Sequence, residues 1–375
     1  MKNHNKINVM VVDDSAVIRG MFANVFDSDP AIEVVATAAN GRMAIDILER
    51  GDIEDVDVIT LDIEMPEMDG LTALPEILKL APKAKIVMVS SLSSHGAEET
   101  LKALSMGATD YMAKPDIGDE RKILHEFTRN LVEKVKVLGG NGLPHSDPSK
   151  VQGDKKRDIG VLPYADAEAE IVLLPNNKIF TPLAIAIGSS TGGPQALSKY
   201  FSSLKGHNIK VPIFITQHMP AKFTTLLAEQ ISSISDIVCH EAEDGMQVED
   251  GNIYLAAGDF HMIIKKNDDG SKYIHLSQNE KENFCRPAVD PMLDSLVSAY
   301  GGKLLVLIMT GMGSDGLSGA KRVVDSGGVI IAQDKESSVV WGMPKAVAEA
   351  GICSSVVPIG EMANETINLS RGCVV

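Results

Sequence analysis

The chain has few cysteines, no long apolar run and no excess of positive charge, and each shortage excludes a class of protein. Its 4 cysteines among 375 residues show neither metal-ligand spacing nor a disulfide framework, which predicts a reducing, cytoplasmic location. No apolar stretch approaches the roughly 20 residues that span a bilayer. A formal net charge of -16 argues against a nucleic-acid partner. We therefore expect a cytoplasmic protein that inserts into no membrane and binds no nucleic acid.

The length and texture of the chain predict two domains joined by a linker. A chain of 375 residues exceeds what one hydrophobic core usually supports. Residues 139–180 are rich in glycine, proline and charge, which favours a flexible linker, although 171–174 are strand-like and are expected to dock on one of the neighbours. The predicted boundaries are 1–138, 139–180 and 181–375. The short apolar run before Asp13 is not that of a signal peptide.

Both predicted domains alternate apolar strands with helical patterns. The expected strands are 9–12, 32–36, 56–61, 85–89 and 111–113 in the first domain, and 183–187, 213–216, 252–255, 304–309 and 329–332 in the second. Helical patterns include 15–26 and 41–50. Such alternation predicts parallel sheets covered on both faces. The expected fold class is therefore α/β, with two doubly wound domains, a flavodoxin-like one followed by a Rossmann-like one.

Acidic residues stand where two expected strands of the first domain end. Asp13 and Asp14 follow the first strand, and Asp62 ends the third. Because the carboxyl ends of parallel strands meet at one edge of a sheet, the carboxylates are expected to converge, and their repulsion requires a cation. Oxygen ligands of this kind suit Mg²⁺, which often shares a phosphate. Ser90 and Lys114 follow the fourth and fifth strands and bring a hydroxyl and an ammonium to the same crevice.

Each acidic residue taken singly is equally well explained as a helix cap or a solvated side chain, but the whole set is not. Segments 11–15, 61–70, 89–91 and 113–115 resemble the receiver domain of bacterial two-component response regulators. The resemblance implies that Asp62 accepts a phosphoryl group from a histidine kinase. It implies a magnesium site made by the following groups: Asp13, Asp14, Asp62 and the backbone carbonyl of Glu64. Ser90, Lys114 and Tyr111 would sense the phosphoryl group, although ordinary packing explains Tyr111 equally well.

In the second domain, Ser190 stands within the sequence GSSTGG (188–193), directly after an apolar run. A strand that ends at small residues predicts a sharp turn into a helix, with free backbone N–H groups that meet an anion. The spacing Gly-x-Ser-x-Gly is typical of the nucleophile of serine hydrolases and predicts an esterase or amidase. A phosphate-binding loop is the alternative, but GSSTGG does not fit the Gly-x-Gly-x-x-Gly dinucleotide pattern.

A serine nucleophile needs a base and a group that orients the base. Of the 9 histidines, His218 is the best placed because it ends the apolar run 213–217. Asp315 lies in the glycine-rich sequence TGMGSDG (310–316), after the expected strand 304–309; a helix cap explains it equally well. The order Ser, His, Asp differs from the Ser, Asp, His order of ordinary α/β-hydrolases and favours a separate scaffold.

Segments of the second domain resemble the catalytic domain of the chemotaxis protein-glutamate methylesterase family over nearly all of 181–358. They are 187–194, 217–220, 223–224, 285–290, 310–316, 332–334 and 337–344. The resemblance implies hydrolysis of glutamate γ-methyl esters on chemoreceptors by Ser190, His218 and Asp315, and as a second activity the deamidation of receptor glutamines. We expect backbone N–H groups at Thr191 and Met312 to stabilise the oxyanion, and no cofactor in this domain.

The same resemblance implies that the unphosphorylated receiver blocks the triad and that phosphate on Asp62 loosens this contact. Two other functions stay open at this point. A receiver can control a catalytically inactive binding module, against which the intact set of Ser190, His218 and Asp315 argues. It can also control a DNA-binding regulator, against which the acidic charge and the lack of a helix-turn-helix pattern argue.

Overall fold

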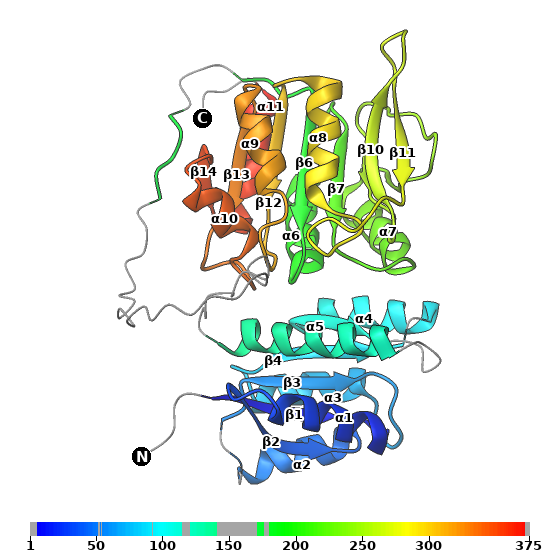
Figure 1. The fold of residues 1–375 in the computed structure, drawn as a ribbon, viewed down its shortest axis with the longest axis vertical. Coiled ribbons are helices and arrows are strands. Elements are labelled where there is room, and N and C mark those ends of the chain that lie inside the picture. The colour runs from blue at the N-terminus through cyan, green and yellow to red at the C-terminus, as the bar shows by residue number, and fades with distance from the viewer. Residues whose placement is uncertain are drawn as a thin grey trace, which may run out of the picture.

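The computed structural model describes residues 6–371 except 52, 54, 92, 115–120, 141–170 and 176–179. It contains two α/β domains that follow one another along the chain (Figure 1). Most of the expected linker, 139–180, lies outside the described residues. Its segment 171–175 lies against the second domain, where the N–H of Leu174 donates to the carbonyl of Cys353 at 2.8 Å.

The first domain is a parallel sheet of five strands in the order β2-β1-β3-β4-β5. The strands are β1 (Ile7–Val12), β2 (Ile32–Ala38), β3 (Val58–Asp62), β4 (Lys85–Ser90) and β5 (Asp110–Ala113). The helices are α1 (Ala16–Asp27), α2 (Gly41–Arg50), α3 (Gly70–Leu80), α4 (Ser94–Met106) and α5 (Arg121–Gly139). Helices α1 and α5 contact each other, as do α2, α3 and α4 in succession. This is the flavodoxin-like arrangement that the sequence predicted.

Short polar side chains begin the first four helices of this domain. The side chains of Ser15, Asn40, Asp69 and Ser93 each accept a hydrogen bond from a backbone N–H in the first helical turn. Each such cap stabilises its helix by about 1 kcal/mol. Strand β3 is buried at all of its positions, as a strand covered on both faces must be. The helix starts therefore hold the strand ends, where the acidic residues stand, in a defined place.

The second domain is a parallel sheet of seven strands in the order β14-β13-β12-β6-β7-β9-β8. The strands are β6 (Ala184–Ser189), β7 (Ile213–Gln217), β8 (Cys239–Glu241), β9 (Ile253–Leu255), β12 (Leu304–Ile308), β13 (Val329–Gln333) and β14 (Ser355–Val357). A separate antiparallel hairpin consists of β10 (His261–Lys266) and β11 (Lys272–Ser277). The chain runs outward from β6 on one side and returns at β12 on the other. Ligands of doubly wound sheets bind at such a switch point.

Helices cover both faces of this second sheet. They are α6 (Gly193–Leu204), α7 (Phe223–Ser235), α8 (Val289–Tyr300), α9 (Leu317–Asp325), α10 (Met343–Glu349) and α11 (Ile359–Ser370). Helix α6 contacts α7 and α11, and α9 contacts α8 and α10. Two helix layers therefore enclose the sheet, which confirms the expected doubly wound, Rossmann-like fold.

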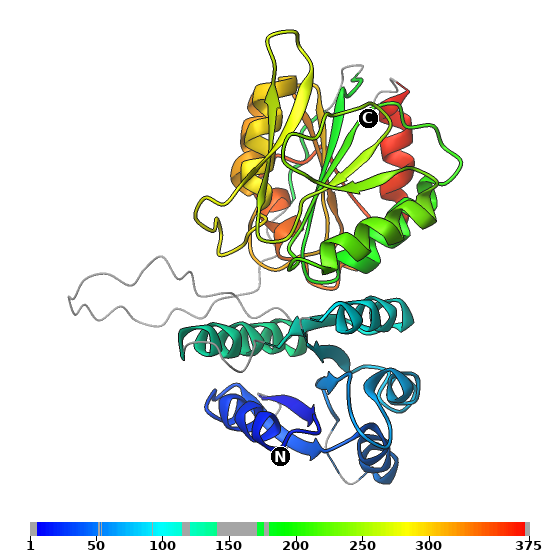
Figure 2. The ribbon, with the colours of Figure 1, turned by 90° about the vertical axis from the view of Figure 1, so that its right-hand side faces the viewer.

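The two domains lie against each other (Figures 1 and 2). Helix α4 of the first domain contacts α6 and α7 of the second, and residues of β5 and α5 contact the second domain as well. The rings of Tyr111 and Phe223 stack with their centroids 4.9 Å apart. Gln195 Nε2 donates to the carbonyls of Ala108 at 2.8 Å and Thr109 at 3.2 Å. Val340 belongs to the same apolar cluster as core residues of the first domain. The edge of the second sheet that carries Ser190 and His218 therefore faces the first domain.

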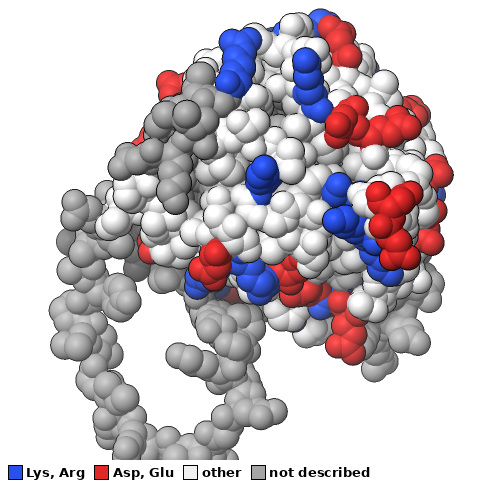
Figure 3. All heavy atoms as spheres, turned by 90° about the horizontal axis from the view of Figure 1, so that it is seen from above, with Lys and Arg blue, Asp and Glu red and all other residues white. Residues whose placement is uncertain are grey.

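The face of the second domain that is turned away from this contact carries charges of both signs. Lysine and arginine side chains lie there beside aspartate and glutamate side chains, mostly toward the rim, and the middle of the face is largely uncharged (Figure 3). Mixed charge of this kind keeps a surface hydrated without a strong field of one sign. In the described part of the chain, no helix is both long and apolar enough to cross a membrane.

Candidate active site

The acidic residues of the first domain lie together at the carboxyl ends of β1 and β3. Asp13, Asp14 and Asp62 each offer one carboxylate oxygen within 4.8 Å of the others. Lys114 Nζ lies 2.6 Å from Asp62 Oδ2 and 2.9 Å from Asp13 Oδ2. The second contact is an ion pair, and beyond it the buried Asp13 Oδ2 accepts no hydrogen bond from the described residues. The lysine compensates part of the negative charge, and the crevice retains acceptor capacity for a cation.

The carboxylate of Asp62 is harder to ionise than an exposed one. Burial raises the pKa of Asp62 to about 6, and the neighbouring Asp13 and Asp14 add to this effect, while Lys114 opposes it. Burial alone would lower the pKa of Lys114, but the Asp62 and Asp13 carboxylates raise it. Lys114 therefore stays a cation next to Asp62, as a group that holds an anionic phosphoryl oxygen must.

The other predicted residues of this site do not contact Asp62 with their side chains in this structure. Ser90 Oγ donates to the carbonyls of Gly96 and Ser91, each at 3.1 Å, and not to Asp62. Tyr111 is buried against Phe223 of the second domain. Glu64 is exposed in the loop after β3. A sensing role of Ser90 thus requires its hydroxyl to leave Gly96 and turn toward Asp62.

Ser190 lies at the carboxyl end of β6, in the turn that leads into α6. Its N–H donates to the carbonyl of Thr310 at 3.0 Å, and its carbonyl accepts from the N–H of Gly193 at 2.7 Å. The turn is closed by Gly192, which has a φ of 75°. A Cβ at Gly192 would also lie 2.6 Å from the Val339 side chain. The glycine is therefore required both for its conformation and for the close approach of the 339 loop.

Gln217, the last residue of β7, joins the serine turn to the neighbouring strand. Its Oε1 accepts from Ser189 Oγ at 2.7 Å, and its Nε2 donates to the carbonyl of Ser190 at 2.9 Å. A Cβ at Gly193 would lie 1.9 Å from that Oε1, so only glycine leaves room for the amide. Gln217 was not among the predicted site residues, although it stands directly before His218 in a segment that carries the family resemblance.

His218 and Asp315 form a hydrogen-bonded pair at the same sheet edge. His218 Nε2 lies 2.7 Å from Asp315 Oδ2, and the two side chains are 11% and 2% exposed. The N–H of His218 donates to the carbonyl of Ser189 at 3.1 Å, which places the imidazole next to the serine turn. An imidazole held by a buried carboxylate has a fixed orientation and one preferred tautomer.

Asp315, which precedes α9, caps the start of α8, and Asp290 of α8 caps the start of α9. Asp315 precedes α9, yet its carboxylate accepts from the N–H groups of Val289 at 2.6 Å and Asp290 at 3.2 Å at the start of α8. Asp290 lies in α8, and its Oδ1 accepts from the N–H of Gly319 at 2.6 Å in α9. Neither helix has a side-chain cap of its own. The orphan N–H groups and the positive end of the α8 dipole thus stabilise Asp315 as an anion.

The two buried carboxylates differ in how easily they ionise. Burial would raise the pKa of Asp315, but His218 and the N–H groups that it accepts lower it. Burial raises the pKa of Asp290 to about 6, and the charge of Asp315 adds to this shift. Asn283 Nδ2 donates to both, at 2.8 Å to Asp315 Oδ1 and at 3.1 Å to Asp290 Oδ2. Asp315 is therefore the carboxylate that carries the charge beside His218.

The second nitrogen of His218 faces a thiol. Cys285 Sγ lies 3.4 Å from His218 Nδ1. Burial alone would lower the pKa of His218, but Cys285 and Asp315 at its two nitrogens raise it. Ser190 Oγ forms no hydrogen bond with any described residue. His218 therefore contacts Asp315 and Cys285 through its two ring nitrogens, but it is not hydrogen-bonded to the serine hydroxyl. Because its thiol contacts His218, Cys285 is a second candidate nucleophile. It was not among the site residues predicted from the sequence.

The backbone around Ser190 favours the serine over the thiol. The N–H groups of Thr191 and Met312 donate to no protein acceptor in the described part of the chain. Both belong to the two turns, after β6 and after β12, that meet at the N–H of Ser190. Free N–H groups beside a nucleophile are what an oxyanion requires, and each is worth about 3–4 kcal/mol to the transition state. The predicted oxyanion residues thus keep unused donors next to Ser190.

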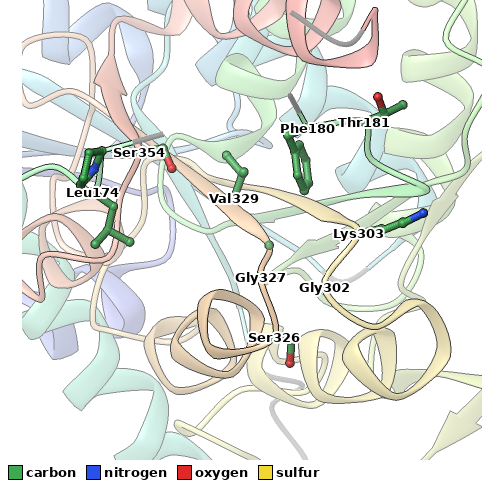
Figure 4. A pocket seen from close by; sticks show the side chains of 11 residues that line it. Leu174, Phe180, Thr181, Gly302, Lys303, Ser326, Gly327, Val329 and Ser354 are labelled. Carbon is green, nitrogen blue, oxygen red and sulfur yellow. The ribbon is translucent and has the colours of Figure 1, made fainter. Parts of the chain in front are cut away.

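A hollow of the second domain lies at the opposite end of the sheet from Ser190. It has a volume of about 460 Å³ and is lined by residues that precede the strands, among them Gly302, Lys303, Gly327 and Phe180 (Figure 4). Doubly wound sheets bind their ligands at the carboxyl ends of strands, and this hollow contains neither Ser190 nor His218. The geometry around Ser190, and not a hollow elsewhere in the domain, therefore identifies the candidate site.

The first domain is a receiver and the second an α/β hydrolytic domain, so the chain is a response regulator with an enzymatic output. Residues 9–126 match the response regulator receiver domain and residues 185–366 the CheB methylesterase family. The chain belongs to the CheB family, the protein-glutamate methylesterases/protein-glutamine glutaminases. The family, the receiver and the enzyme class expected from the sequence are thereby confirmed.

Relatives match this chain over almost its whole length. It is 48% identical to a protein-glutamate methylesterase/protein-glutamine glutaminase of Rhodospirillum rubrum, over 95% of this chain and 93% of the relative. A protein of the same description from Azospirillum brasilense is also 48% identical, over 95% and 91%. The crystal structure of the Thermotoga maritima CheB methylesterase catalytic domain is 42% identical and covers 50% of this chain and 99% of its own, with a TM-score of 0.49.

Proposed function

We propose that the chain hydrolyses glutamate γ-methyl esters on chemoreceptors, with Ser190 as nucleophile, His218 as base and Asp315 as the residue that orients the base. The observation that carries the proposal is the buried His218–Asp315 pair, 2.7 Å apart, directly beside the turn that holds Ser190. The test is the release of labelled methanol from a methylated chemoreceptor by the full chain. If no methanol is released, the proposal is wrong.

The proposed reaction proceeds through an acyl-enzyme. Ser190 Oγ attacks the ester carbonyl and its proton moves to His218 Nδ1, because Nε2 donates to Asp315. The N–H groups of Thr191 and Met312 hold the oxyanion while the bond to methoxide breaks. Methanol leaves with the proton from His218, and water then hydrolyses the glutamyl–serine ester to free glutamate. The same attack on a glutamine amide releases ammonia, which we propose as the second activity.

The pH dependence follows from the raised pKa of His218. The base accepts a proton only when it is neutral, and Asp315 and Cys285 keep it protonated to a higher pH than an ordinary histidine. We expect kcat/KM for a small methyl ester to rise with pH through a midpoint above about 6.5, the ordinary histidine value. A profile of kcat/KM from pH 5 to 10 measures this, and a midpoint below that value would contradict the predicted charge environment.

We propose that Asp62 is the phosphoacceptor of the receiver and that a histidine kinase is its phosphodonor. Lys114, already 2.6 Å from Asp62, would pair with a phosphoryl oxygen, and Ser90 would turn from Gly96 to hold another. Asp13, Asp14, Asp62 and the carbonyl of Glu64 would hold Mg²⁺. The buried Asp13 Oδ2, which beyond its ion pair with Lys114 accepts no hydrogen bond from the described residues, fits a hard cation. The ion when bound neutralises phosphoryl charge.

Removal of the divalent cation tests this site. Without it the carboxylates repel an incoming phosphoryl group, so chelation with EDTA is expected to slow phosphorylation of Asp62 by acetyl phosphate about tenfold or more. Intact-protein mass spectrometry measures the phosphorylated fraction with time, and readdition of Mg²⁺ is expected to restore the rate. An equal rate with and without EDTA would exclude a role of the cation.

We propose that the docked receiver restrains the enzyme and that phosphorylation loosens the contact. Tyr111 lies three residues before Lys114 and stacks on Phe223, and Met312, an oxyanion candidate, packs against the apolar cluster that includes Val340 and receiver residues. A structural change at Asp62 can thus reach the sheet edge that carries Ser190 through a few packed residues.

We retain the boundaries 1–138, 139–180 and 181–375 as proposals, together with a cytoplasmic location.

A further inference from the structure

The turn formed by residues 281–285, between β11 and α8, has a backbone conformation that its own residues disfavour. Glu282 and Cys285 exchange two backbone hydrogen bonds, at 3.1 and 2.9 Å, and the central residues Asn283 and Phe284 have φ values of 51° and 64°. A turn with two left-handed residues favours asparagine first and glycine second. Phenylalanine at the second position is strained, because an L side chain disfavours a left-handed backbone. Its ring is also 67% exposed, so core packing does not account for it.

The inner side of the turn holds the catalytic pair. Asn283 donates to Asp315 and Asp290, and Cys285 Sγ lies 3.4 Å from His218 Nδ1. With the Nε2–H of His218 donating to Asp315, Nδ1 is the nitrogen that hydrogen-bonds Cys285 Sγ, as the acceptor when the imidazole is neutral and as the donor when it is charged. The atom that must take the proton of Ser190 is therefore already in use.

The outer side of the turn is held by the receiver. Glu126 Oε1 of α5 lies 3.4 Å from Lys281 Nζ. The guanidinium of Arg129, one helical turn further along α5, lies over the ring of Phe284 at 5.7 Å from its centroid. Exposed contacts of these two kinds are individually weak. They bias the position of the turn and are lost as soon as α5 moves away.

We propose that the 281–285 turn is a latch, in which receiver helix α5 holds the position where Cys285 occupies His218 Nδ1 and keeps it from Ser190. Release of α5 lets the turn lift Cys285 away, after which Nδ1 can accept the serine proton. This inference rests on the proposed function, because it assigns the regulation of that same site. The latch differs from a steric block of the active site by the receiver. A steric block excludes a receptor from Ser190 but leaves His218 able to accept the serine proton.

A small probe that reacts with the serine separates these two possibilities. With a fluorophosphonate, Ser190 Oγ bonds to phosphorus, fluoride leaves, and the serine proton passes to His218 Nδ1. In the unphosphorylated full chain we expect Cys285→Ala to label at least fivefold faster than the wild type, and acetyl phosphate to accelerate this variant less than twofold. The double variant Arg129→Ala/Lys281→Ala is expected to label faster as well, whereas Asn130→Ala, on the same helix, is expected to match the wild type.

Equal or slower labelling of Cys285→Ala, or a wild-type rate for the Arg129→Ala/Lys281→Ala variant, would overturn the latch. The two surface substitutions keep the test decisive should Cys285→Ala fail to fold, which circular dichroism detects. Failure of the proposed function gives a different result. In that case Ser190→Ala would label as fast as the wild type, or the wild type would not label with the phosphodonor present.

Discussion

Ser190→Ala in the full chain is expected to lower the rate of methanol release from a methylated receptor by on the order of 10⁴-fold or more. The reason is that the free donors of Thr191 and Met312 and the His218–Asp315 pair remain, but the atom that forms the acyl-enzyme is gone. The measurement is the release of labelled methanol under saturating receptor. Receptor binding should change little, since an alanine replaces only a hydroxyl, so the loss is expected in kcat and not in KM.

The matched control is Ser203→Ala. Ser203 is an exposed serine of α6 whose hydroxyl donates to the carbonyl of Lys199 in the same helix at 2.9 Å, and its loss is expected to leave the rate within twofold. Activity that survives in Ser190→Ala but disappears in Cys285→Ala would contradict the assignment. It would move the nucleophile to the thiol, which is the group that contacts His218 in this structure.

Asp62→Asn is expected to abolish both the incorporation of phosphate and the increase of activity that a phosphodonor causes. An amide oxygen carries no negative charge and is too weak a nucleophile toward phosphorus, and the change removes one oxygen ligand from the acidic cluster. Phosphorylation is followed by intact mass, and methanol release is measured with and without acetyl phosphate.

Asp55→Asn makes the same chemical change at an exposed position outside the acidic cluster and is the control. It is expected to be phosphorylated and activated like the wild type. An Asp62→Asn protein that still responds to acetyl phosphate in the methanol assay would show that another residue receives the phosphoryl group, or that the small molecule acts on the enzyme directly.

The sequence predicts the position of those site residues that stand at the carboxyl ends of parallel strands. Asp62 ends a parallel strand, and Asp13, Ser190 and His218 directly follow one. A correct strand assignment therefore already places Asp13 with Asp62, and Ser190 with His218, at one sheet edge. Asp315 follows β12, which pairs with β6. Glycine and small residues in these turns marked the strand ends, and the apolar runs marked the strands themselves.

What could not be predicted depends on how distant elements pack. Cys285 and Asn283 reach the active site because the turn after the β10–β11 hairpin folds back onto α8. The two strands of that hairpin, HMIIKK and KYIHLS, show no regular alternation of apolar and polar residues that would mark where it ends. Strands β8 and β14 have three residues each, too few for a period. The stacking of Tyr111 on Phe223 joins two separately folded domains, and either residue alone looks like ordinary core.

The most direct measurement is to trap the covalent intermediate and determine which side chain carries it. The full chain is activated with acetyl phosphate, mixed with a methylated receptor and quenched in acid within a turnover, and its peptides are mapped by mass spectrometry. We predict a glutamyl adduct on the peptide that contains Ser190, at the serine oxygen. An adduct on Cys285, or rapid methanol release with no adduct at Ser190 at any quench time, would contradict the account.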